Sequence, residues 1–149
     1  MNEKNPVVLE PGGGAQFGSP TGAGGRFKVG VENSAGSLTI FESHRPAGDP
    51  GGPALHKHAF DEAFYVLEGD YTIQVGERLV NASAGAFVYV PGGTIHTLSH
   101  SGDGEGRMLT VCSPGGIEDL FLAPDAEARA AAASKLGSEE VGPPLATDA

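Results

Sequence analysis

The chain has 149 residues, a formal net charge of −10 at pH 7, 24 glycines, 11 prolines and one cysteine, Cys112. This length fits one domain of the common size, about 100–150 residues, and the negative charge argues against nucleic acid or an anionic membrane as a partner. A single cysteine excludes an internal disulfide and, with no signal-peptide or membrane-spanning apolar segment, predicts a cytoplasmic protein.

The first 25 residues are expected to form an extended arm. It contains an apolar piece, Val7–Leu9, and two loop-like glycine clusters, Gly12–Gly14 and Gly22–Gly25. After the arm, short apolar segments follow at regular spacing, each bounded by Gly, Pro, Asn or Asp, as is typical of strands. The predicted strands are Arg26–Val31, Ser37–Glu42, Ala54–His58, Glu62–Glu68, Tyr71–Val75, Arg78–Val80, Ala86–Val90, Ile95–His100 and Arg107–Cys112.

No helical pattern separates these strands, which predicts an antiparallel sandwich or barrel over residues 26–116. Helix is expected only in the C-terminal segment, residues 117–149. A short helix is predicted at Ile117–Leu122, and an Ala-rich helix opens at Pro124 and reaches about Leu136 before a glycine. The predicted fold class is therefore all-β with a short C-terminal helical segment.

Four side chains in two stretches of the chain have the chemistry of one metal site. His56 and His58 lie two positions apart on a predicted strand, so both imidazoles point to the same face. Glu62 has the same parity if no turn intervenes, and His96 comes from the second stretch. Three imidazoles and one carboxylate suit a divalent ion such as Fe, Mn, Ni, Cu, Zn or Co.

These two stretches resemble the paired motifs of the cupin superfamily. Residues 52–69 match the pattern G(X)5HXH(X)3-4E(X)6G from His56 onward, with the leading glycine displaced. Residues 85–100 match the pattern G(X)5PXG(X)2H(X)3N through His96, and His100 stands where the pattern has Asn. Over most of its length the chain also resembles small bacterial cupins described as quercetin-dioxygenase-like.

The resemblance implies a small jelly-roll β-barrel that binds its metal through His56, His58, Glu62 and His96. It further implies a homodimer that pairs through edge strands or swapped terminal segments. A vestigial or weakly loaded site is the alternative for the four ligands.

Five further residues each have a functional and a structural interpretation. His100 shares the parity of His96, so it is either a base beside the ligands or substrate, or a histidine on the rim of the barrel. His44 and Arg45 either gate the pocket or belong to a solvated loop. Tyr65 and Tyr89 either bring a phenol near the substrate or pack as ordinary strand aromatics.

An octahedral ion with four protein ligands keeps two positions for water, O2 or substrate, whereas tetrahedral closure would make the site structural. We expect a quercetinase-like dioxygenase acting on a small enolic or phenolic substrate, in which Glu62 can loosen and act as a base. Phe41, Phe64 and Leu98 are expected in an apolar pocket wall. The alternatives are a redox-neutral isomerase, lyase or cyclase of natural-product metabolism, and a metabolite-binding protein without chemistry.

Overall fold

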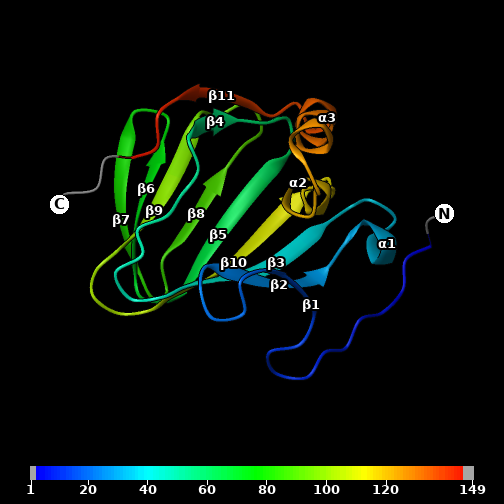
Figure 1. Ribbon diagram of the computed structural model, residues 1–149, viewed down its shortest axis with the longest axis horizontal. Helices are drawn as coiled ribbons and strands as arrows, with labels where there is room; N and C mark the ends of the chain where they lie inside the picture. The colour runs from blue at the N-terminus through cyan, green and yellow to red at the C-terminus, as the bar shows by residue number, and fades with distance from the viewer. Residues whose placement is uncertain (1–2, 146–149) are drawn as a thin grey trace.

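The computed structural model describes residues 3–145 and contains two antiparallel β-sheets that face each other, with short helices at one end (Figure 1). The six-stranded sheet has the order β1 (Ala15–Gly18), β2 (Gly24–Val29), β3 (Thr39–Arg45), β10 (Gly106–Ser113), β5 (Asp61–Glu68), β8 (Phe87–Val90). The five-stranded sheet has the order β11 (Glu139–Gly142), β4 (Leu55–Lys57), β9 (His96–Ser101), β6 (Asp70–Val75), β7 (Arg78–Ser83). This jelly-roll arrangement confirms the all-β prediction.

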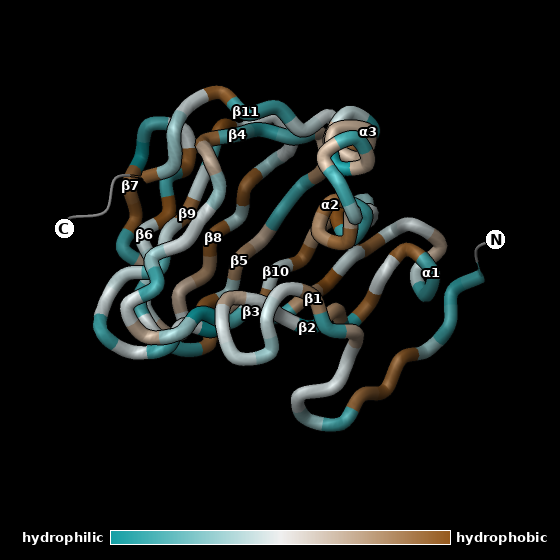
Figure 2. The backbone as a smooth tube through the Cα atoms, in the orientation of Figure 1, coloured by the Kyte–Doolittle hydropathy of each residue, from teal (hydrophilic) through white to brown (hydrophobic). Residues whose placement is uncertain are grey.

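Alternation of side chains along the strands builds the interior. On β5, Glu62, Phe64 and Val66 are buried, whereas Asp61 and Tyr65 between and beside them are exposed. This period of two is what a strand with one face toward a core produces. The hydrophobic residues accordingly lie along the strands, and the connecting loops are mostly hydrophilic (Figure 2).

The apolar interior has two clusters, and burying each large side chain contributes about 1.5–3 kcal/mol. The larger cluster lies between β5, β6, β8 and β10, and the smaller one lies where β3 and β10 approach the helices. The larger cluster consists of Phe64, Val66, Tyr71, Ile73, Ala82, Val90 and Met108. The smaller cluster consists of Phe41, Phe60, Cys112 and Ile117. Cys112 is fully buried within the smaller cluster.

Two helices lie in the C-terminal segment, as expected. The short helix α2 spans Glu118–Phe121 and α3 spans Ala126–Leu136. Asp125 caps α3 because its side chain accepts a hydrogen bond from the Ala128 backbone at 2.8 Å. Gly137 ends the helix in a left-handed conformation, with φ of 65°. Within the described residues, none of the helices has the length and apolarity that crossing a membrane requires.

Three elements differ from the sequence expectation. Strand β1 lies inside the segment expected as an extended arm, where it pairs with β2, and Phe17 stacks on Phe121 with ring centroids 5.2 Å apart. A single helical turn, α1 (Val31–Ser34), begins at the last residue of the predicted strand Arg26–Val31. Strand β11 lies in the expected C-terminal segment and pairs with β4. Residues 146–149 of that segment lie outside the described residues.

Candidate metal centre

The structure brings His56, His58 and His96 together, although the first and the last of them are 40 positions apart in the sequence. His56 lies on β4 directly opposite His96 at the start of β9, because these two residues are register partners. One nitrogen atom from each of the three rings lies within 4.8 Å of the others. This cluster can hold a metal ion.

Each imidazole of the cluster is oriented by the backbone. The Nδ1 atom of every ring lies at hydrogen-bond distance from a main-chain carbonyl oxygen, which can only accept, so Nδ1 carries the proton. The Nε2 lone pair is then directed away from the backbone, as in histidines that bind metals. The accepting carbonyls for His56, His58 and His96 belong to Ala54, Phe60 and Thr94, at 2.7, 2.9 and 2.8 Å.

Glu62 reaches the same point from the other sheet. Its Oε1 atom lies 3.0 Å from Nε2 of His58 and 3.0 Å from Nε2 of His96. Its Oε2 atom accepts a long hydrogen bond of 3.6 Å from the Cys112 thiol. Because Glu62 is only 5% exposed, its carboxylate depends on these neighbours for stabilisation.

The protonation of these groups favours cation binding. Burial raises the pKa of the Glu62 carboxyl, but the contacts with His58 and His96 outweigh burial and lower it to about 2. Burial also lowers the pKa of His56, which keeps that ring neutral. The site then presents an ionised carboxylate and the neutral imidazole of His56 to the same point, and both are ligands that a divalent cation accepts. The donor set therefore fits a metal ion.

A cavity of about 320 Å³ adjoins the cluster, and His56, Glu62 and His96 form part of its wall. Its volume is near the lower end of the range for small-molecule sites, about 300–1,000 Å³. The predicted wall residues lie together in this cavity, as do both residues considered for gating. These are Phe41, Phe64, Leu98, His44 and Arg45.

Sequence reasoning missed other residues of the cavity wall, chiefly Tyr71 on β6 and Ser43 on β3. Tyr71 shares the parity of buried Ile73, and this parity was the one available signal for an inward side chain. Ser43 comes from the end of a strand that was predicted to stop earlier.

Two groups of candidates lie away from the histidine cluster. His100 is four positions beyond His96 on β9, is buried, and does not line the cavity. Tyr65 and Tyr89 are 42% and 53% exposed, so their side chains are at the surface rather than beside the cavity.

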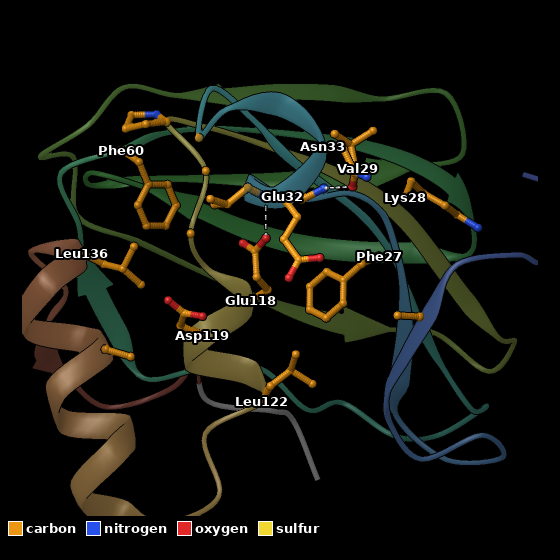
Figure 3. Close-up of a pocket in the computed structure, with 18 of the residues that line it drawn as sticks. Phe27, Lys28, Val29, Glu32, Asn33, Phe60, Glu118, Asp119, Leu122 and Leu136 are labelled. Atoms are coloured by element: carbon orange, nitrogen blue, oxygen red, sulfur yellow. Dashed lines mark hydrogen bonds between the residues drawn. The ribbon is translucent and has the colours of Figure 1, made fainter. Parts of the chain in front are cut away.

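A larger groove of about 870 Å³ runs between β2, α1 and the two C-terminal helices (Figure 3). Among the described residues that line this groove there is no histidine. One carboxylate in this groove belongs to Glu118. It already accepts hydrogen bonds from the Val31 backbone N–H at 2.9 Å and from the Thr39 hydroxyl at 2.6 Å. These bonds tie α2 to α1 and β3, which is a structural role, so the smaller cavity is the candidate site.

Comparison with solved structures supports the fold. A predicted oxalate decarboxylase of Thermotoga maritima superposes with a TM-score of 0.64 at 16% identity, covering 72% of this chain and 99% of that chain. An RmlC-like cupin of Shewanella frigidimarina gives 0.61 at 16% identity, covering 77% and 96%. The polyketide cyclase RemF of Streptomyces resistomycificus gives 0.59 at 17% identity, covering 71% and 78%. At these identities the likeness establishes the fold alone.

Comparison of the sequence with a curated relative and with family models adds to the likeness in fold. An uncharacterized protein of Streptomyces coelicolor, SCO3923, is 39% identical over 57 residues, which are 38% of this chain and 53% of that relative. The chain thus spans about half the length of this relative. The family model described as "Cupin domain" matches residues 34–112, a range that includes every candidate ligand. With more than half of the chain inside that match, the protein belongs to the cupin domain family.

Proposed function

We propose that the protein is a metal-dependent enzyme of the dioxygenase type that acts on a small enolic or phenolic substrate. The observation that carries the proposal is a cluster of three imidazoles, each oriented by a backbone carbonyl, two of which, His56 and His96, line a cavity with several apolar wall residues. His56, His58 and His96 would hold the ion, with Glu62 as a fourth ligand. The metal, when bound, would polarise an enolate or phenolate oxygen and, if redox-active, supply reaction with O2.

The surrounding residues have separate tasks in this proposal. Phe41, Phe64 and Leu98 would exclude water and pack against the carbon skeleton of the substrate. Glu62 contacts two of the histidines through one oxygen, Oε1, so its other oxygen can face a substrate hydroxyl when the carboxylate rotates. Rotation away from His58 and His96 would remove the contacts that lower the pKa of the carboxyl, while burial continues to raise it, so the rotated carboxylate would be the stronger base that proton transfer requires.

The second candidate is a redox-neutral isomerase, lyase or cyclase in which the metal acts only as a Lewis acid. It is supported by the fold likeness to the polyketide cyclase RemF and to the predicted oxalate decarboxylase, neither of which is named as a dioxygenase. The third candidate is a protein that binds a metabolite without transforming it.

One experiment separates the three candidates. The protein is loaded in turn with Fe, Mn, Ni, Cu, Zn and Co, and each form is incubated with enolic and phenolic compounds while O2 uptake and products are followed. Substrate-dependent O2 uptake supports the dioxygenase proposal. Product formation at full rate under strict anaerobiosis supports the redox-neutral enzyme, and tight binding without product from any metal form supports the binding protein. The homodimer and the cytoplasmic location stay predictions, the first to be checked by the mass in solution.

A further inference from the structure

The far end of the metal-site cavity is polar and positively charged. Strand β3 ends at Arg45, whose side chain lines the cavity together with Ser43 and with Tyr71 of β6. Tyr71 is the register partner of His100 on β9, four residues from His96. At about 3.3 Å per residue, this end is about 13 Å from the histidine cluster along the strand.

The Arg45 guanidinium has unused hydrogen-bonding capacity. Its nearest carboxylate oxygen is Asp49 Oδ1 at 3.9 Å, and within residues 3–145 the guanidinium makes no hydrogen bond. The group is held in place because it packs against the backbone of Gly51, in the space that a Cβ atom there would take. Among the described residues that line the cavity, Arg45 is the one lysine or arginine.

The Tyr71 hydroxyl is a second donor without an acceptor. Tyr71 is 2% exposed, and its Oη atom is buried with no hydrogen-bond partner in the part of the chain that the structure describes. A buried hydroxyl of this kind normally has a partner, because leaving it unpaired is costly. Burial raises the pKa of Tyr71 to about 12, although the charge of Arg45 acts to lower it, so the phenol keeps its proton.

A glycine packs closely against the Tyr71 hydroxyl and the His100 ring, so that no larger residue fits beside them. Gly106 on β10 is the register partner of Arg45, and a Cβ atom on it would lie 2.6 Å from Tyr71 Oη and 3.0 Å from His100 Nε2. His100 donates from Nδ1 to the Asp49 carbonyl at 2.9 Å, which leaves its Nε2 as a buried acceptor without a partner. The phenol and this nitrogen are not hydrogen-bonded to each other.

We infer that Arg45 and Tyr71 form an anion-binding subsite that holds a carboxylate group of the substrate, while the rest of the molecule extends toward His56, Glu62 and His96. A guanidinium and a hydroxyl are complementary to the two oxygens of a carboxylate, and charge-assisted hydrogen bonds of this kind are the strong ones. The inference rests on the proposed function, because it names a substrate class for the same cavity: a small organic acid that carries an enol, phenol or carbonyl at its other end.

The subsite can be tested in the metal-free protein, so that a carboxylate cannot bind the ion instead. Benzoate and its neutral isostere benzamide are titrated into the full chain by calorimetry. We expect benzoate to bind at least tenfold more tightly than benzamide. Arg45→Gln should weaken benzoate at least tenfold and Tyr71→Phe at least threefold, with benzamide unchanged. The matched control is Arg78→Gln, which removes an exposed arginine from β7 and should leave benzoate binding unaltered.

Equal binding of benzoate and benzamide, or benzoate binding that survives Arg45→Gln, would overturn the subsite. Unchanged binding in Tyr71→Phe would remove Tyr71 from it and indicate that the phenol pairs with His100 instead. Metal content is measured in parallel. If the wild type binds no metal but still prefers benzoate, the proposed function fails and the subsite stands. If it binds metal but shows no preference for benzoate, the subsite fails and the proposed function stands.

Discussion

The Nε2 atom of His96 lies 3.0 Å from the Oε1 atom of Glu62, although the two residues belong to strands of different sheets. His96 begins β9 in the five-stranded sheet, and Glu62 lies near the start of β5 in the six-stranded sheet. The candidate metal centre is therefore a junction between the two halves of the jelly roll. Both the metal content and the stability of the protein should respond to changes at this junction.

Substitution of His96 should abolish stoichiometric metal binding. In His96→Ala one of three clustered imidazoles is lost, whereas the strands keep their backbone pairing, so the circular dichroism spectrum should still show β structure. Elemental analysis after loading with Co or Zn measures the effect. His44→Ala is the matched control, because His44 lies outside the cluster and bonds to the Ser19 carbonyl. Full metal content in His96→Ala would contradict the assignment.

Glu62→Gln should weaken metal binding at least tenfold while the fold is retained. Glutamine has the shape of glutamate but lacks the anionic charge that faces His58 and His96. Competition with a chromophoric chelator gives the affinity. The control variant is Glu77→Gln, because Glu77 is exposed and makes no ion pair within residues 3–145. If both variants bind metal like the wild type, Glu62 is not a ligand.

Metal loading should raise the melting temperature. A ligand that binds only the folded state at 100 times its dissociation constant adds about 2.7 kcal/mol, which for a chain of this size corresponds to roughly 5–10 °C. Differential scanning fluorimetry with and without each ion measures the shift, and excess chelator should reverse it. An equal shift in His96→Ala would show that the ion acts elsewhere on the protein.

Tyr71 should ionise only in strongly alkaline solution. Tyr65 and Tyr89 are exposed, whereas burial raises the pKa of Tyr71 to about 12. The native state then keeps a proton that the unfolded state loses above pH 10, so Tyr71 contributes stability that is complete below pH 10 and declines as pH rises toward 12. Absorbance at the tyrosinate band should show a late phase near pH 12 that is lost in Tyr71→Phe. A late phase that persists in Tyr71→Phe would refute this assignment.

Cys112 should resist thiol reagents in the native protein. The thiol is fully buried, and burial, followed by the nearby charge of Glu62, raises its pKa, so little thiolate forms. A disulfide-exchange reagent should modify the thiol only after unfolding in denaturant. Rapid modification of folded protein would show that the strand β10 opens far more readily than its packing suggests.

Much of the fold was predictable because strand signals are local. The run Glu62–Glu68 alternates and is bounded by turn residues, and the structure has β5 at Asp61–Glu68. The helix that ends at Gly137 was equally clear, because cap residues act within one turn. Strands β1 and β11 were not predicted, since their sequences are polar or glycine-rich and only pairing with β2 and β4 makes them strands.

The residues of the candidate site also divide into those that the sequence predicted and those that it did not. The motif spacing predicted that His56, His58 and His96 come together, and the structure clusters them. The placement of Arg45 and Tyr71 in one cavity depends on how β3 and β6 of different sheets face each other. That relation is long-range, and no spacing within either strand encodes it.

The short strand β4 has a consequence for synthesis of the protein. It carries His56 and lies between β9 and β11, with Glu140 as the register partner of His56. A ribosome makes β11 after all four candidate ligands have left the peptidyl-transfer centre. The backbone that carries His56 is therefore paired on both of its edges only after the C-terminal segment has been made and has folded back onto β4.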